Sequence, residues 1–376
     1  MTASARIATE DWLQAQPSGT ALALPAHCYL GEAALERDRR AVLARGWQLV
    51  AHEHLLAGPG DHAVAEIAGV SLVLVVDEAG TLRALHNVCR HRAGPLASCA
   101  GRGLQRLTCQ YHGWTYALDG ALLGAPGMGR APGFDASQVR LPHARVARWQ
   151  GLVFACLDEA APDFVEVVDG LDALLAGAGL ASMRFARRVV YEVACDWKVY
   201  VDNYLEGYHV ARVHPGLGAL LDARAYATTL ARWHSVQASP IASDAGLYGA
   251  GQAVYAFVWP NTMINALPGR LQTNRVLPAG PGRCTVVFDY AYPQGQGEGR
   301  APGEGDEAGR AAAAARIEAD LAFSDTVQAE DAAICEAVQR GLASGSWTPG
   351  RLNPFEERGV WHFHELLREA WREGRA

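Results

Sequence analysis

Four residues with metal-binding side chains form two pairs in the first third of the sequence. One residue separates Cys89 from His91, two separate Cys109 from His112, and seventeen lie between the pairs. Two thiolates and two imidazoles suit a two-iron, two-sulfur centre in which the cysteines hold one iron and the histidines the other. Because neutral imidazoles replace two charged thiolates, such a Rieske centre accepts an electron at a higher potential than an all-cysteine cluster. The pattern therefore predicts an electron relay.

A structural zinc site is the alternative, because two cysteines and two histidines also satisfy tetrahedral zinc. Zinc fingers, however, pair cysteine with cysteine and histidine with histidine, whereas each pair here is mixed. Turn residues at Gly94-Pro95 and Gly113-Trp114 favour the iron–sulfur cluster, since they let backbone amides approach its sulfurs.

A second group of candidate ligands lies between residues 202 and 214, where two histidines and two carboxylates are concentrated. On a regular helix Glu206 and His209 share a face. His214 leaves that face unless a π-bulge or a helix end intervenes before Pro215. Two imidazoles and one carboxylate make the facial triad of non-heme iron(II), which leaves positions for dioxygen. We therefore expect His209 and His214 to bind iron.

The third iron ligand must be an acidic residue that is distant in sequence. Asp331, on a helix expected near the C-terminus, is the preferred candidate, and Asp325 and Glu330 are its rivals. Carboxylates on an exposed helix are usually only solvated, so the pattern by itself leaves all three open.

Length and charge limit the classes of protein that fit. The 376 residues suffice for two domains, and the net charge of -7 gives no basic surface for nucleic acid. No signal peptide is apparent in residues 1–11, and the most apolar stretch, residues 64–76, is too short to span a bilayer. The six cysteines other than Cys89 and Cys109 lack paired spacing, which suggests a reducing compartment. We expect a cytoplasmic protein that binds neither membrane nor nucleic acid.

The hydrophobic pattern predicts three segments along the chain. Residues 1–45 form a lead-in with a helix over 32–45, and residues 46–160 contain short alternating runs separated by turns, which indicates an all-β domain. Residues 161–376 alternate helical and strand patterns, which indicates an α+β domain with an antiparallel sheet. Expected helices cover residues 197–213, 311–342 and 360–371, and an exposed loop is expected over 293–309.

These motifs resemble those of the Rieske non-heme iron oxygenases, the ring-hydroxylating oxygenase α-subunit family, over nearly the whole chain. The motifs are Cys89-Arg90-His91-Arg92, Cys109-Gln110-Tyr111-His112-Gly113-Trp114, Asp202-Asn203-Tyr204-Leu205-Glu206-Gly207-Tyr208-His209 and Glu330-Asp331-Ala332-Ala333-Ile334-Cys335-Glu336. The resemblance implies an α+β chain in which an N-terminal all-β Rieske [2Fe-2S] domain precedes a helix-grip-like catalytic domain. It also implies that Asp331 is the third ligand of the mononuclear iron.

The resemblance further implies a head-to-tail homotrimer in which one subunit's cluster lies beside its neighbour's iron. Glu206 occupies the position of the acid that links a cluster histidine, here His112, to an iron histidine, here His209. The segment from Asn203 to His209 most resembles the branch that oxidises choline, glycine betaine, carnitine and stachydrine. By this resemblance, NAD(P)H electrons arrive through a separate reductase of the flavin or ferredoxin type.

We expect an oxygenase, a monooxygenase rather than a dioxygenase, that hydroxylates or N-demethylates a quaternary ammonium compound with dioxygen. Trp233, Tyr255, Phe257 and Trp259 are candidates for an aromatic wall, although aromatic residues in strands are most often core. Arg275 is a candidate partner for a substrate carboxylate, and an exposed arginine fits the pattern equally well.

Two alternative functions remain open from the sequence. The first is an oxygenase that hydroxylates or demethylates aromatic compounds, which product analysis would separate from the quaternary-amine enzyme. The second is a Rieske electron carrier without catalytic iron, against which the set of His209, His214 and Asp331 argues.

Overall fold

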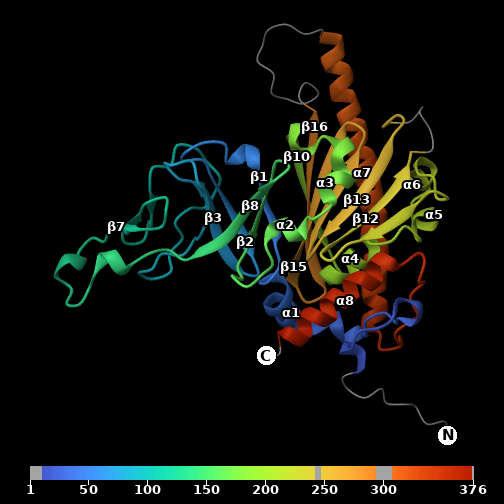
Figure 1. Cartoon of the computed structure of the whole chain (residues 1–376), viewed down its shortest axis with the longest axis horizontal. Coiled ribbons are helices and arrows are strands. Elements are labelled where there is room, and N and C mark those ends of the chain that lie inside the picture. Colours follow the sequence, from blue (N-terminus) through green and yellow to red (C-terminus); the bar gives the residue numbers. More distant parts are fainter. Residues whose placement is uncertain (1–10, 242–246, 294–306, 375–376) are drawn as a thin grey trace. The chain divides into compact units, whose positions relative to one another are not determined.

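The computed structural model describes residues 11–241, 247–293 and 307–374 (Figure 1). The chain divides into two compact units, of which residues 43–164 form one and residues 1–42 with 165–376 form the other. The lead-in helix α1, Gly31–Asp38, therefore belongs to the same unit as the C-terminal half, and a π-helical turn, Arg39–Leu43, follows it. The loop expected over residues 293–309 lies mostly outside the described residues.

Residues 43–164 form an all-β unit, as predicted. Six strands pair in the order β1-β9-β8-β4-β3-β2, and three short strands pair in the order β5-β6-β7. The bounds are β1 Gln48–His52, β2 His62–Ile67, β3 Val70–Val76, β4 Leu82–His86, β5 Leu107–Thr108, β6 Thr115–Tyr116, β7 Leu122–Gly124, β8 His143–Trp149 and β9 Leu152–Cys156. Strands β7 and β8 were not expected. Most of the β8 side chains are only partly buried, which leaves a weak apolar pattern.

Strand β3 lies between the two hydrophobic clusters of this unit. Leu72 and Leu74 pack into one cluster, while Val73 and Val75 pack into the other. Successive side chains of a strand point to opposite faces, so a run of apolar residues buries both faces of β3. The second cluster also contains Cys89 and Cys109. The cluster-ligand loops are therefore anchored on the core.

The other unit is built on a seven-stranded antiparallel sheet in the order β10-β16-β15-β14-β13-β12-β11. The bounds are β10 Met183–Val193, β11 Ala227–Leu230, β12 His234–Pro240, β13 Gln252–Val258, β14 Thr262–Leu267, β15 Arg270–Gly280 and β16 Arg283–Pro293. Strands β11, β12 and β14 were not expected. Every residue of β14 is buried, so this strand lacks the alternation by which half-buried strands are recognised.

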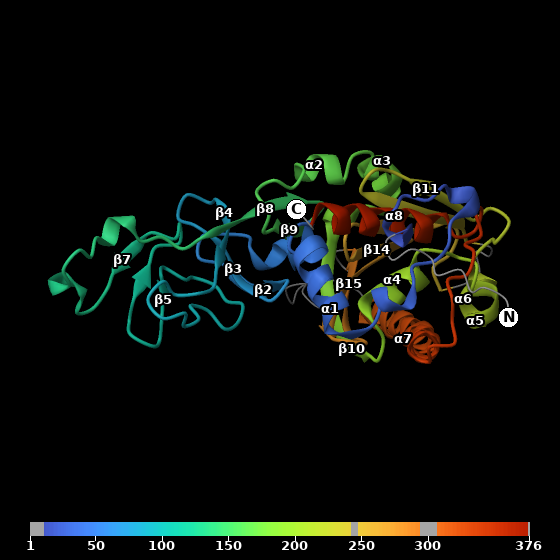
Figure 2. The same ribbon diagram turned by 90° about the horizontal axis from the view of Figure 1, so that it is seen from below.

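Helices surround this sheet and complete the predicted α+β fold. The bounds are α2 Phe164–Val167, α3 Leu171–Leu175, α4 Trp197–Tyr204, α5 Val210–Val213, α6 Pro215–Leu220, α7 Glu307–Ala343 and α8 Arg358–Glu373. Helix α7 runs alongside the strands (Figure 1), and α4 packs against α7, β15 and β16. Helix α8 packs on β11 (Figure 2). Among the described helices, none has a stretch that is both long and apolar enough to cross a membrane.

A buried group of charged residues holds α4 in place. The ammonium of Lys198 is fully buried and pairs with Asp38 of α1 and, at 2.7 Å, with Asp196, which precedes α4. Asp38 also accepts hydrogen bonds from the indoles of Trp197 and Trp371 at 3.0 and 2.9 Å. Because a buried charge is costly without partners, this group ties α1, α4 and α8 together.

The chain leaves the helical conformation between α4 and α5. A single helical segment over residues 197–213 was predicted, and this is wrong: α4 ends at Tyr204, and Val210 begins a separate short helix. A Cβ atom on Gly207 would lie 2.6 Å from the ring of Tyr226, so glycine lets this ring approach the break. Either a π-bulge or a helix end was expected before Pro215. The structure has the helix end, because α5 ends just before His214.

Candidate functional site

The two predicted cluster-ligand loops have the same backbone hydrogen-bonding pattern. The amide of Cys89 donates to the carbonyl of Gly94 at 2.8 Å, and the amide of Cys109 donates to that of Trp114 at 2.9 Å. Each cysteine carbonyl in turn accepts from the amide four residues later, at 3.0 Å in both loops. Two matching loops present two matching ligand pairs, as a cluster with two irons requires.

The four side chains of these loops fit a Rieske cluster. Cys89 and Cys109 are buried, whereas His91 and His112 are only partly buried. The Nδ1 atoms of the two imidazoles lie 3.2 Å apart, so that both rings face the same point. The ring of His91 stacks on Trp114 with centroids 4.9 Å apart, which fixes its orientation. The thiols thus lie on the protein side and the imidazoles on the solvent side of one site.

Two further residues shape this site: Gly94, already expected as a turn residue of the cluster loop, and Tyr116, which the sequence did not indicate. A Cβ atom on Gly94 would lie 2.9 Å from the sulfur of Cys109, so only glycine fits there without a shift. The hydroxyl of Tyr116 lies 3.3 Å from the sulfur of Cys89 and accepts the amide of Arg90. A hydroxyl beside a cluster sulfur raises the reduction potential. In the sequence, nothing about Tyr116 indicates that its hydroxyl lies beside a cluster sulfur.

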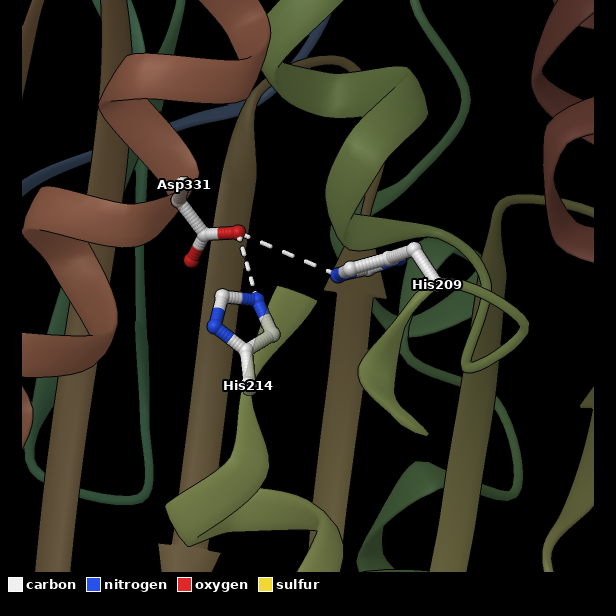
Figure 3. A group of neighbouring side chains, drawn as sticks. All are labelled: His209, His214 and Asp331. Carbon is white, nitrogen blue, oxygen red and sulfur yellow. Dashed lines mark hydrogen bonds and ion pairs between the residues drawn. The ribbon is translucent and has the colours of Figure 1, made fainter. Parts of the chain in front are cut away.

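The structure brings His209, His214 and Asp331 together in the second unit (Figure 3). One ligand atom from each lies within 4.8 Å of the others. Nε2 of His214 is 3.0 Å and Nε2 of His209 is 3.8 Å from the same carboxylate oxygen of Asp331. His209 precedes α5, His214 follows it, and Asp331 comes from α7. The two ends of α5 supply the histidines on one side, and α7 supplies the acid on the other.

A second carboxylate supports each histidine. Nδ1 of His209 lies 2.6 Å from Glu206, and Nδ1 of His214 lies 2.7 Å from Glu330. These bonds orient the rings and leave both Nε2 atoms facing Asp331, which is the arrangement that metal-binding histidines adopt. Glu330, a rival for the third ligand, therefore acts behind His214. The other rival, Asp325, accepts a hydrogen bond from Tyr191.

This donor set fits mononuclear iron(II). Two imidazole nitrogens and one carboxylate oxygen are the ligands of the facial triad. Asn203 donates to Asp331 at 2.5 Å, which fixes the carboxylate. Glu206 was expected to share a helix face with His209. It lies instead in the break, where it also accepts the backbone amides of Tyr208 and His209.

A cavity of about 110 Å³ opens beside the three candidate iron ligands. One part of its lining is aromatic, and these residues are Tyr200, Tyr204, Tyr226, Tyr248, Tyr255, Phe288 and Phe323. Of the aromatic residues suggested from the sequence, only Tyr255 lines the cavity. Phe257 and Trp259 pack against Phe363 in the core instead, and Trp233 stacks with Arg232.

The other part of the lining is polar and comes from two neighbouring elements. Arg270, Gln272 and Asn274 occupy alternate positions of β15, while Ser324, Gln328 and Asp331 lie on one face of α7. Arg275, the suggested carboxylate partner, is not among the residues that line the cavity. The sequence did contain a pattern that indicates the polar lining. Polar residues occupy every second position of the β15 segment and recur at helical spacing in the α7 segment.

Comparisons with known proteins identify both domains. Residues 46–140 match the Rieske [2Fe-2S] domain, and residues 180–373 match the catalytic domain of the ring-hydroxylating α-subunit. The chain belongs to this family of Rieske oxygenases. It is an oxidoreductase that combines a Rieske cluster with a mononuclear iron and takes electrons from a reductase. The alternative of an electron carrier without a catalytic domain is thereby excluded.

Relatives of this chain are monooxygenases. It is 37% identical over 350 residues to choline monooxygenase of Arabidopsis thaliana, a match that covers 88% of this chain and 78% of that protein. It is 29% identical to the carnitine monooxygenase oxygenase subunit of Escherichia coli K12, covering 93% and 94%. The structure of the quaternary ammonium monooxygenase CntA with L-carnitine superimposes with a TM-score of 0.80 at 26% identity, covering 95% and 99%. These likenesses place the chain among monooxygenases of the family.

Proposed function

We propose that this chain is the oxygenase component that hydroxylates or N-demethylates a quaternary ammonium compound of the betaine type. The observation that carries the proposal is the aromatic cavity beside His209, His214 and Asp331. A quaternary ammonium cannot donate a hydrogen bond, and its best partners in a protein are the faces of aromatic rings. Choline and carnitine, named for the relatives, both carry this group.

The residues take the following roles in this proposal. Cys89, His91, Cys109 and His112 hold the Rieske cluster, and His209, His214 and Asp331 hold the iron. When bound, the cluster relays single electrons and the iron activates dioxygen. Glu206 and Glu330 orient the two histidines through Nδ1, and Asn203 orients Asp331. The cavity holds the substrate beside the metal and keeps water from it.

The reaction inserts one oxygen atom of dioxygen into a C–H bond of the substrate, and the second oxygen leaves as water with two electrons and two protons. If that carbon is an N-methyl group, the resulting hemiaminal breaks into formaldehyde and a tertiary amine. Burial raises the pKa of the Tyr200 hydroxyl, which lines the cavity with Asp331, well above its usual value, so this hydroxyl stays neutral.

The assembly and its partners form part of the proposal. We assign the Rieske domain to residues 46–160 and the catalytic domain to 161–376, in a cytoplasmic homotrimer served by a flavin- or ferredoxin-type reductase. Glu206 would then join His209 to the partner subunit's His112.

Turnover with a substrate panel tests the function. The iron-loaded protein is reduced under dioxygen with choline, glycine betaine, carnitine and benzoate, and formaldehyde and hydroxylated products are measured. We expect formaldehyde or a hydroxylated product with a quaternary ammonium compound, and neither from the Asp331→Ala variant. Hydroxylated benzoate without formaldehyde would instead identify an aromatic-ring oxygenase.

A further inference from the structure

We propose that Gln328 is a dioxygen-binding residue, which donates a hydrogen bond from its amide nitrogen to the dioxygen molecule at the iron site. The cavity beside His209, His214 and Asp331 has to admit two reactants, dioxygen and an organic substrate. Its aromatic lining suits the organic substrate, and Gln328 on α7 suits dioxygen. This role requires iron at the three ligands, whichever organic substrate the enzyme oxidises.

The orientation of the Gln328 amide is fixed by Tyr200. The hydroxyl of Tyr200 donates to the amide oxygen of Gln328 at 2.5 Å, and both side chains are buried. Burial raises the pKa of Tyr200 well above its usual value, so its hydroxyl keeps the proton that it donates. An amide accepts through its oxygen and donates through its nitrogen, so this bond identifies the end that faces Tyr200 as the oxygen.

The amide nitrogen at the other end of the Gln328 side chain is free. Within residues 11–241, 247–293 and 307–374 it has no hydrogen-bond partner, although Gln328 is only 2% exposed. Gln328 lines the same cavity as the three candidate iron ligands. A buried N–H group without a partner is costly, so this nitrogen points to an acceptor that enters the cavity.

Other amide nitrogens of the cavity lining already have acceptors in the protein. The nitrogen of Asn203 donates to Asp331 at 2.5 Å, and that of Gln237 donates to the backbone carbonyl of Tyr204 at 2.7 Å. These bonds hold the cavity together. The nitrogen of Gln328, in contrast, is available to a ligand.

Gln328 lies one helical turn from the metal ligand of α7. It precedes Asp331 by three residues, so the two side chains share a face of the helix, about 5 Å apart along its axis. A glutamine side chain is long enough to cover this separation. The amide is therefore placed beside the facial triad, which leaves positions for dioxygen.

Dioxygen is the reactant that matches this donor. At the reacting end of a quaternary ammonium substrate, neither the ammonium nor its C–H bonds can accept a hydrogen bond. Dioxygen receives electrons during turnover, so negative charge develops on its oxygen atoms, and a fixed N–H group stabilises such charge. Because the bond from Tyr200 holds the amide before the electrons arrive, no reorganisation of the donor is needed when the charge appears.

Nitric oxide tests this role, because it is a diatomic ligand of ferrous iron that occupies the dioxygen position without being turned over. The iron-loaded protein is titrated with nitric oxide in the absence of dioxygen, and binding is followed by electron paramagnetic resonance. Infrared spectra of the N–O stretch are recorded in H₂O and in D₂O. We expect a D₂O shift in the wild-type protein. Gln328→Met should abolish the shift and weaken nitric oxide binding by about 2- to 10-fold.

Gln339→Met is the matched control, since it makes the same substitution on α7. Gln339 lies eight residues beyond Asp331, about 12 Å along the helix, and is not among the residues that line the cavity. This variant should keep the wild-type shift and affinity. Gln328→Met leaves the buried Tyr200 hydroxyl without its acceptor, so the double variant Tyr200→Phe/Gln328→Met, which removes both polar partners, serves if the single variant is unstable.

The D₂O shift decides the outcome. A shift that is missing in the wild-type protein, or that persists in Gln328→Met or the double variant, overturns the proposal, and the amide nitrogen then binds only water. The proposed function would stand in that case, because the products from the substrate panel test it separately. A wild-type protein that forms no complex between iron and nitric oxide would contradict the iron site itself, and the proposed function would fail with it.

Discussion

Glu206→Gln is the change that most sharply probes the link between the two metals. One oxygen of Glu206 accepts Nδ1 of His209 at 2.6 Å, and the other accepts the backbone amides of Tyr208 and His209. A glutamine has a single oxygen, so its NH₂ group must face one of these donor sets. Replacing an ionic hydrogen bond costs about 1.5 to 3 kcal/mol. Iron affinity should therefore fall by about 10- to 100-fold.

Glu330→Gln is the matched control, because Glu330 supports His214 through one hydrogen bond that a glutamine oxygen can still accept. With both variants saturated with iron, the reduced protein is mixed with dioxygen and substrate, and reoxidation of the cluster is followed by its absorbance. We expect Glu206→Gln to slow reoxidation by about 100-fold and Glu330→Gln by less than about tenfold. Equal rates in both variants would refute the role of Glu206 in joining the metals.

Three further predictions concern the scaffold and the cluster. Lys198→Met leaves the buried carboxylates of Asp38 and Asp196 without their cation, and the free energy of unfolding in denaturant should fall by about 3 to 5 kcal/mol; a loss below about 1 kcal/mol would contradict this. Burial lowers the pKa of His362 from 6.5 to about 4, so the neutral ring stabilises the fold above pH 6.5, and this contribution is lost as the pH falls through 4. The free energy of unfolding should fall between pH 7 and pH 4, and in His362→Gln this fall should be smaller by up to about 3 kcal/mol. An unchanged pH dependence would argue against this prediction. Gly94→Ala places a methyl group against the sulfur of Cys109 and should abolish the visible spectrum of the cluster, while Gly129→Ala, where a Cβ meets nothing within 4 Å, should preserve it.

The candidate metal ligands could be selected from the sequence because ligand chemistry imposes spacing. Few metal sites other than a Rieske cluster need a mixed Cys-x-His and Cys-x-x-His pattern, and the structure places Cys89 and Cys109 in one buried cluster with His91 and His112 beside each other. The acid was harder to choose. Asp331, Glu330 and Asp325 lie on one helix, and only the rotation of α7 against the sheet decides which one faces the histidines.

The helix break and the cavity could not be predicted in the same way. Residues 197–213 have helical periodicity throughout, yet the helix ends at Tyr204, and Tyr226 of a later segment packs against Gly207 in the break. Strand β14 is buried at every position, so its pattern carries no period. The cavity wall combines β15 with α7, and which faces meet depends on tertiary packing rather than on local sequence.

Iron content tests the central claim, which is that His209, His214 and Asp331 hold a catalytic iron beside the Rieske cluster. The wild-type protein should contain about three irons per chain, two in the cluster and one mononuclear. Asp331→Ala should contain about two, with an unchanged cluster spectrum and no product. A variant that kept the third iron, or a wild-type protein that turned over with only two, would contradict the account.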